Sequence, residues 1–210
     1  MEFFDVINTR KTIRKYKEEI PPLSDIKKIA DAGRLAPSAT NNQNWRFIAV
    51  FNKEIKKQMT EAVHERFDEV QSLIKNETDL QKMSGYRYYS MFFKDAPVVM
   101  VIVEKARKST IMSLLEKNGV TGKELKKYNN RSSILSMGAA IENMSLAAHA
   151  LGYGSCWMCA PIIAKEEFKK IFNLDETDKV VSLLAIGYPQ EKTPPPPPKK
   201  PLDDIFEAVF

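Results

Sequence analysis

Two periods of apolar and polar residues along this chain predict a layered fold of helices and strands. Residues 45–51 and 96–104 form apolar runs typical of strands, and the second run is continuous, as expected of a strand buried on both faces. Shorter runs at 154–158 and 179–187 predict two more strands. Helical spacing of apolar residues predicts helices at 3–9, 25–35, 53–75, 80–94, 109–118 and 164–172. Strands interleaved with long helices indicate an α+β or α/β layered domain.

The helix predicted at residues 133–151 is the axis of the expected core. It carries apolar or small side chains on nearly every face, with Glu142, Asn143 and His149 as the strongly polar exceptions, and Gly152 is placed to end it as a left-handed cap. Three polar residues near mid-bilayer argue against a membrane span. A helix apolar all round has more surface than one small core covers easily, so we expect a second copy of the chain to cover the rest. Burial wholly within one monomer is the alternative.

Three local features complete the pattern. Ser24 is predicted to be the N-cap of the helix at 25–35, and residues 119–130 form a polar connection into the central helix. The tail at 188–210 begins with a stiff stretch of five prolines, 194–198, and ends with apolar residues. We expect this apolar end to dock, either on its own chain or on a partner subunit.

Composition and charge then narrow the class of protein. The chain has 210 residues, 43% hydrophobic and 28% charged, which is ordinary for a folded globular protein. Its net charge is +5, but lysines lie beside glutamates along the chain, as on solvated helix faces, so a phosphorylated small ligand fits the excess better than nucleic acid. The first residues, MEFFDVINTRK, contain no apolar stretch typical of a secretory signal, and we expect a cytoplasmic protein with no membrane or nucleic-acid partner.

Familiar catalytic motifs do not occur in the sequence. There is no G-x-G-x-x-G after a strand, no G-x-x-x-x-G-K and no H-E-x-x-H, and the two histidines, His64 and His149, lie on different predicted helices. We therefore expect no metal site. Cys156 and Cys159 form a C-x-x-C pair, but on a strand these positions face opposite ways and no helix N-terminus lowers the pKa of the first thiol. A thiol oxidoreductase is kept as an alternative that the Cys156→Ser variant would test.

The densest basic cluster follows the first predicted helix. Residues 10–16, RKTIRKY, contain four cations and a hydroxyl. If the segment is extended, Arg10, Thr12 and Arg14 share one face and converge on one point. Two guanidiniums and a hydroxyl suit a phosphate monoester, because arginine donates in a planar fork that matches phosphate oxygens. An exposed, solvated cluster without a ligand is the alternative.

A loop rich in amides lies at residues 36–45, APSATNNQNW. Asparagine and glutamine amides both donate and accept, which suits the edge of a heterocycle. A simple helix-to-strand loop built from turn-forming residues is the alternative. The helix at 80–94 carries Tyr86, Tyr88, Tyr89 and Phe92, which either belong to the core or form a wall over a planar ligand.

Four segments together resemble the nitroreductase family of FMN-dependent NAD(P)H oxidoreductases. RKTIRKY at 10–16 resembles the family's R-R-S-x-R-x-F opening, and 36–45 resembles its A-P-S-x-x-N-x-Q-P-W loop. NMSLAAHALGYGSCW at 143–157 resembles N-M-x-L-A-A-x-x-L-G-L-G-S-C-W. GYP at 187–189 with KKPL at 199–202 resembles the family's G-Y-P and R-K-P-L ending. The segments occur in the family's order and span nearly the whole chain.

The resemblance implies an α+β fold, a three-layer α/β/α sandwich, as one FMN-binding domain of residues 1–210 with 188–210 as a tail that reaches a partner. It also implies an intertwined homodimer with two FMN sites at the interface. The matching positions that bind the phosphate and ring edge are Arg10, Lys11, Thr12, Arg14 and Lys199. Those that reach the flavin across the interface are Pro37, Ser38 and Asn41, with Gln43 in the same loop. Pro161, Ile162 and Ile163 match the turn whose backbone N–H meets flavin N5.

Some positions depart from the family pattern. Thr12 replaces serine and keeps the hydroxyl, Lys199 replaces arginine and loses the bidentate fork, and Asn44 replaces the proline before the tryptophan. Glu142 stands where glutamine is common, and nothing in the sequence explains it.

The resemblance implies a two-step, ping-pong reaction in which NAD(P)H passes hydride to FMN and an electron-poor acceptor then uses the same cleft. No side chain is required as a general base, so no catalytic residue is assigned. The acceptor could be a nitroaromatic, a quinone, an enone or free flavin, and the sequence selects neither an acceptor nor NADH over NADPH. A flavin-binding storage or sensor protein without turnover is the alternative.

Overall fold

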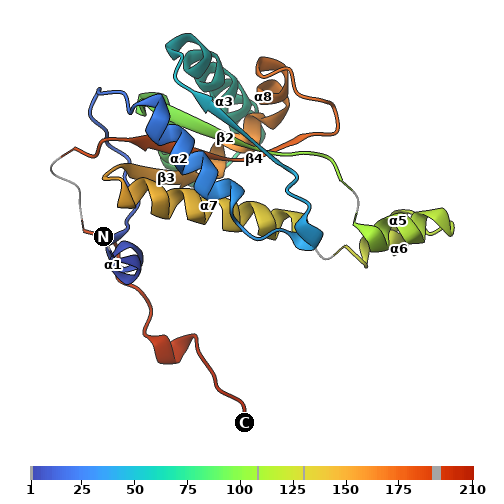
Figure 1. The fold of residues 1–210 in the computed structure, drawn as a ribbon. Helices are drawn as coiled ribbons and strands as arrows, with labels where there is room; N and C mark the ends of the chain where they lie inside the picture. Colours follow the sequence, from blue (N-terminus) through green and yellow to red (C-terminus); the bar gives the residue numbers. More distant parts are fainter. Residues whose placement is uncertain (1, 108, 130, 191–194) are drawn as a thin grey trace.

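The computed structural model describes residues 2–107, 109–129, 131–190 and 195–210. One sheet has the strand order β1-β2-β4-β3, and each neighbouring pair is antiparallel. The strands are β1 (Trp45–Val50), β2 (Val98–Glu104), β3 (Gly154–Met158) and β4 (Lys179–Gly187). Helices α2 (Leu23–Arg34) and α7 (Ser132–Ala150) cover one face, and α3 (Lys53–Leu73) and α8 (Lys165–Ile171) cover the other (Figure 1). The predicted three-layer α/β/α sandwich is therefore confirmed.

Strand β2 is the centre of the sheet and contributes to both layers of the core. Its side chains alternate: Val99 and Val101 pack with α3 and α8, whereas Met100 and Ile102 pack with α2 and α7. All four are 0–1% exposed, as the continuous apolar run predicts. The sheet therefore separates two cores, one on each face.

The remaining elements connect these layers. They are the helices α1 (Phe3–Thr9), α4 (Glu77–Ser90), α5 (Thr110–Lys117) and α6 (Gly122–Lys126) and the 3-10 turns η1 (Ala39–Asn41), η2 (Phe92–Asp95), η3 (Ala160–Ala164) and η4 (Leu202–Asp204). Two predictions were wrong here. The connection at 119–130 contains the helix α6. This helix has only about one and a half turns, which is too short to show helical periodicity in the sequence. Ser24 is not an N-cap, because α2 begins at Leu23 after Pro22, whose fixed φ starts the helix without a side-chain cap.

Helix α7 has a covered inner face and a largely uncovered outer face. Met137, Ile141, Met144 and Ala148 point to the sheet and are 0–1% exposed. On the opposite side Leu135 is 70% exposed, so the alternative of burial wholly within one monomer is wrong. The helix ends as predicted. Gly152 has φ +87°, its N–H donates to the His149 carbonyl oxygen, and the Tyr153 N–H donates to that of Ala148.

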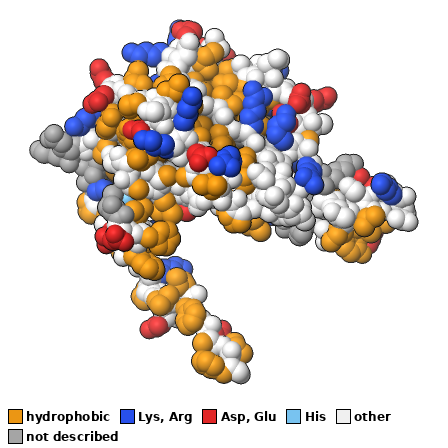
Figure 2. Space-filling view, in the orientation of Figure 1, with side chains coloured by type: hydrophobic (Ala, Val, Ile, Leu, Met, Phe, Trp, Pro, Cys, Tyr) orange, Lys and Arg blue, Asp and Glu red, His pale blue; other side chains and the backbone are white. Residues whose placement is uncertain are grey.

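Three segments project from the sandwich: α1, an arm formed by α5 and α6, and the C-terminal tail (Figure 1). Hydrophobic side chains gather on the arm and the tail (Figure 2). The apolar end of the tail does not dock on its own chain, because Leu202, Ile205 and Phe206 are each 65–67% exposed. Of the predicted proline stretch, Pro194 lies outside the described residues. In the described part of the chain, no helix combines the length and apolarity that crossing a bilayer requires.

Candidate functional site

The basic segment predicted at residues 10–16 is extended and lies along the edge strand β3. Thr12 forms a parallel bridge with Ser155, and the Ile13 N–H donates to the Ser155 carbonyl oxygen at 2.9 Å. Ile13 is buried against Gly154, where an added Cβ would lie 2.7 Å from the Ile13 side chain. Because Ile13 points inward, the alternation of an extended chain turns Thr12 and Arg14 outward, and both are exposed.

The two arginines of this segment have different neighbours. Arg10 approaches Glu142 of α7, with 3.4 Å between Nε and Oε1. Arg14 lies over the Phe92 ring, 5.9 Å from its centroid, on the side of the sheet covered by α3. The structure thus places both side chains on the outer side of one segment but directs them to different partners. Their convergence on one ligand stays a prediction.

Sequence reasoning missed the role of Glu142, and the structure supplies it. The carboxylate is the acidic neighbour of Arg10, and about two turns further along the same face of α7 His149 Nε2 lies 2.8 Å from Thr9 Oγ1. The two polar side chains of α7 therefore tie the end of α1 and the start of the basic segment to the outer face of the central helix. Burial and the nearby Arg10 lower the pKa of His149.

The Arg14 guanidinium also lies beside a buried thiol. Cys156 is 3% exposed in the core between the sheet and α3, and burial raises its pKa, partly opposed by Arg14. Cys159 is exposed in the following turn, and both thiols are free. A buried thiol with a raised pKa is a poor nucleophile, which weighs against the thiol oxidoreductase alternative. Among the described residues, no group of three or more His, Cys, Asp or Glu side chains could hold a metal ion.

The amide-rich loop has a strained backbone. Thr40, Asn41 and Gln43 have φ of 53°, 52° and 46°, the left-handed region that non-glycine residues occupy at a cost of about 1 kcal/mol or more each. Two side-chain bonds hold the loop: the Gln43 N–H donates to Ser38 Oγ at 3.1 Å, and Gln43 Nε2 donates to Asn41 Oδ1 at 2.9 Å. Strain held by internal bonds is typical of binding loops rather than of plain connections.

This loop is anchored to the first turns of α7. The Ala39 N–H donates to Ser136 Oγ at 3.2 Å, and the buried Asn44 donates to Ser133 Oγ at 2.8 Å. Asn44 therefore has a structural use for its amide that the proline of the family pattern could not supply. The anchor at Ser136 and the His149 contact are thirteen residues apart, roughly 20 Å along the helix axis. In one chain the amide-rich loop thus lies at the first turns of α7, whereas the basic segment begins beside the middle of α7, where Arg10 approaches Glu142, and follows Thr9 at the other end.

The remaining candidate residues lie in the turn after β3 and in the tail. Pro161 is buried, and Ile162 and Ile163 pack against the core under α3. Pro161 has no N–H and the Ile162 N–H donates to the Cys159 carbonyl oxygen at 3.1 Å. Lys199 is exposed in the tail. That these two parts meet the basic segment at one ligand stays a prediction.

The aromatic residues of α4 divide into two groups. Tyr86 packs edge-on against Phe67 of α3, with 6.0 Å between ring centroids, and so braces the helix. Tyr88 and Tyr89 are 66% and 62% exposed, contact each other edge-on, and both contact Phe92. Because Arg14 lies over Phe92, this exposed aromatic group borders the basic segment.

Comparison with known proteins identifies the class of protein to which these features belong. The features are cations on a half-buried sheet edge, an amide-rich loop and a central helix with an uncovered face. The model of the nitroreductase family matches residues 7–188, and the chain belongs to this family. A solved structure of a BluB-like flavoprotein from Clostridium difficile 630 is 27% identical, with a TM-score of 0.87 over 100% of both chains. A relative from Methanothermobacter thermautotrophicus, whose name includes NAD(P)H nitroreductase, is 29% identical over 91% of this chain and 79% of its own length. Iodotyrosine deiodinase 1 of Sus scrofa is 26% identical over 99% of this chain and 68% of its own.

Proposed function

We propose that this protein is an FMN-dependent oxidoreductase that transfers hydride from NAD(P)H to an electron-poor small molecule in the cytoplasm. The observation that carries the proposal is the extended segment at 10–16, fixed on β3 with its cations and hydroxyl outward, in a chain that belongs to the nitroreductase family. The flavoprotein named above, which is similar over its whole length, supports the choice of a flavin.

The donors in this segment fit the phosphate of FMN. In the proposal Arg10, Lys11, Thr12 and Arg14, with Lys199 of the tail, hold the phosphate and the ring edge through charge-assisted hydrogen bonds. Arg10 approaches Glu142 through Nε, so its two terminal nitrogens remain available to an anion. Glu142 thereby orients the guanidinium instead of neutralising it, since the pair is too long and too exposed to be tight.

A homodimer completes the site in this proposal. One chain carries the basic segment and the amide-rich loop at different positions along α7, and it leaves the outer face of α7 and the apolar tail uncovered. Two copies packed through that face in opposite directions would place the loop with Pro37, Ser38, Asn41 and Gln43 of one subunit beside the basic segment of the other. The tail would then cover the partner, which accounts for its exposed apolar end.

The residues of this chain would act by positioning. When bound, FMN would supply the redox chemistry, taking two electrons from the reduced nicotinamide and giving them to the acceptor. In the turn after β3, Pro161 has no N–H, so we assign the contact with the N5 edge to the backbone of Ile162 and Ile163. Tyr88, Tyr89 and Phe92 would form an apolar wall that orients a planar acceptor and excludes water.

The class of acceptor is proposed only broadly, as a nitroaromatic, a quinone, an enone or a flavin. The deiodinase named above adds halogenated aromatic compounds to the substrates worth testing, because it is similar to nearly all of this chain. Each of these molecules has a planar unsaturated group, which suits the exposed aromatic wall.

The purified protein tests this proposal directly. We expect a yellow protein with a flavin band near 450 nm that bleaches on addition of NADH or NADPH without oxygen and returns on addition of a nitroarene or a quinone. A bound flavin that never bleaches would favour the storage or sensor protein. A colourless protein that does not bind added FMN would refute both, and activity lost in Cys156→Ser would favour the thiol oxidoreductase.

A further inference from the structure

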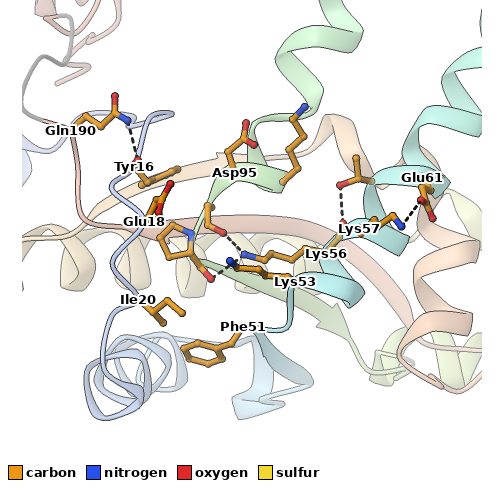
Figure 3. A pocket seen from close by; sticks show the side chains of 14 residues that line it. Tyr16, Glu18, Ile20, Phe51, Lys53, Lys56, Lys57, Glu61, Asp95 and Gln190 are labelled. Carbon is orange, nitrogen blue, oxygen red and sulfur yellow. Dashed lines mark hydrogen bonds and ion pairs between the residues drawn. The ribbon is translucent and has the colours of Figure 1, made fainter.

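A cavity of about 840 Å³ lies outside the candidate flavin site. It opens between the chain that follows the basic segment, the end of β1, the start of α3 and the turn before β2 (Figure 3). None of the candidate flavin residues lines it. Its volume is within the range of small-molecule sites and far above that of an inorganic anion.

Lysines dominate the charged side of this cavity. Lys53, Lys56 and Lys57 come from the first turns of α3, and Lys94 comes from the turn before β2. Lys53 and Lys56 lie in the first turn of α3 beside one acidic residue, Glu54, so the lysines there exceed the negative charge that the helix dipole favours.

The carboxylates in the cavity do not neutralise these lysines. Glu18, Glu61 and Asp95 line it as well, against four lysines. Glu61 is engaged by Lys57, with 3.8 Å between Oε1 and Nζ. In the described part of the chain, Lys53 and Lys94 make no ion pair and no side-chain hydrogen bond.

Lys56 is the buried centre of this lysine group. The residue is 8% exposed, and its Nζ donates to the carbonyl oxygens of Ala96 at 2.6 Å and Pro97 at 3.2 Å (Figure 3). An ammonium has three donors, and the third has no acceptor among the described residues. Burial lowers the pKa of Lys56 and the neighbouring Lys53 lowers it further, against an opposing effect of Asp95. The two neighbouring ammonium groups of Lys53 and Lys56 both line the cavity, and together they favour the binding of an anion there.

The other side of the cavity is apolar. Ile20, which is 52% exposed, and Phe51 line it (Figure 3), and Pro97 belongs to the same lining. An exposed isoleucine and an aromatic ring across from a cationic group suit a ligand with an apolar body and an anionic end.

We propose that this cavity binds a small organic phosphate, with its phosphate at Lys53, Lys56 and Lys94 and its apolar body on Ile20 and Phe51. Lysines serve as point charges for phosphate, and the third donor of Lys56 supplies a buried hydrogen bond. The site is independent of the flavin and of turnover.

Isothermal titration calorimetry with phenyl phosphate tests the proposal. The protein is first saturated with FMN and kept in a buffer without phosphate, so that the basic segment at 10–16 does not compete for the probe. We expect one molecule of phenyl phosphate per chain, bound more tightly than inorganic phosphate, and no binding of phenol. The double variant Lys53→Gln/Lys94→Gln should bind at least about tenfold more weakly, because two charged donors are removed, and its visible flavin spectrum should not change.

A matched control separates this site from the general positive charge of the protein. Lys27→Gln/Lys75→Gln removes the same two charges from exposed positions outside the cavity and should bind phenyl phosphate like the wild type. Equal affinity of the wild type and Lys53→Gln/Lys94→Gln would overturn the proposal, as would phenyl phosphate bound no more tightly than inorganic phosphate. Binding seen only without FMN would instead place the probe at the basic segment and also overturn it.

Discussion

The two faces of α7 differ in composition and in surroundings. The inner face, Met137, Ile141, Met144 and Ala148, is sealed against the sheet, whereas the outer face presents Leu135, Gly138, Glu142, Leu146 and His149. Sealing the inner face is enough to fix the fold of one chain. Glu142 and His149 of the outer face contact Arg10 and Thr9 at the start of the chain, so packing of the core does not account for these two residues.

The largest effect is expected on the inner face. Met144→Ala should lower the free energy of unfolding by about 2–5 kcal/mol, since Met144 is fully buried and a Cβ on Gly33 would already lie 2.8 Å from its Cγ. Urea-induced unfolding at fixed protein concentration measures this. Leu73→Ala, at a residue 79% exposed, should change the free energy by less than about 0.5 kcal/mol. A loss below about 1 kcal/mol for Met144→Ala would mean that the inner face is not a packed core.

The next effect concerns the outer face and self-association. Leu135→Glu should weaken the proposed homodimer about 100-fold, because it would place an unpaired charge in the proposed apolar interface, with little change in the fold of each chain. Sedimentation velocity across a range of protein concentrations measures the dissociation constant. Leu73→Glu adds the same charge at an exposed leucine of α3 and should leave the dimer intact. A Leu135→Glu protein that associates like the wild type would show that the outer face of α7 is not the interface.

A smaller effect separates the two members of the ion pair on this face. Arg10→Gln should weaken FMN binding about tenfold or more, because it removes a charged donor to the phosphate. Glu142→Gln should change it by no more than a few-fold, since a partly exposed ion pair contributes about 0–1 kcal/mol. Titration of the flavin-free protein by FMN fluorescence quenching measures both. If Glu142→Gln were the more damaging variant, Glu142 would be a ligand and not an orienting neighbour.

The smallest effect is a dependence on pH. The pKa of His149 is lowered in the folded chain, so below the unfolded value of about 6.5 the unfolded chain binds more protons and stability falls as the pH decreases. His149→Gln should therefore lose less stability than the wild type between pH 7 and pH 5.5. Thermal unfolding at both pH values measures the difference. Identical pH profiles would show that His149 does not contribute.

Most of the fold was predictable from the sequence, because the buried apolar residues recur at the spacing of a helix or a strand. The continuous run of β2 and the apolar spacing of α3 each predicted an element within a few residues of its observed bounds. Helix α6 was not predictable, since five residues span less than two turns and carry no stripe. The start of α2 was missed because the helix begins at Leu23 after Pro22, whose side chain has no group that could cap it, so the serine signal at Ser24 was misleading.

The candidate site was predictable only in its parts. The basic segment could be identified as one face of an extended chain, and the structure confirms that Ile13 points inward. The partners of its side chains could not be predicted from the sequence. The contacts of Arg10 with Glu142 and of Arg14 with Phe92 join residues that are far apart in the chain. The strain of the amide-rich loop was equally hidden, since Thr40, Asn41 and Gln43 are ordinary turn residues until their φ values are known.

The bridge between Thr12 and Ser155 has a consequence for aggregation. Strand β3 is an edge of the sheet, and an open edge is a template on which another chain can add a strand. The basic segment occupies part of that edge through the Ile13 N–H and lines it with arginine and lysine. A substitution that frees this segment, such as one that adds a side chain at Gly154, would therefore expose an unpaired strand edge and weaken the proposed ligand site. We expect such a variant to aggregate and to lose the colour of the proposed flavin.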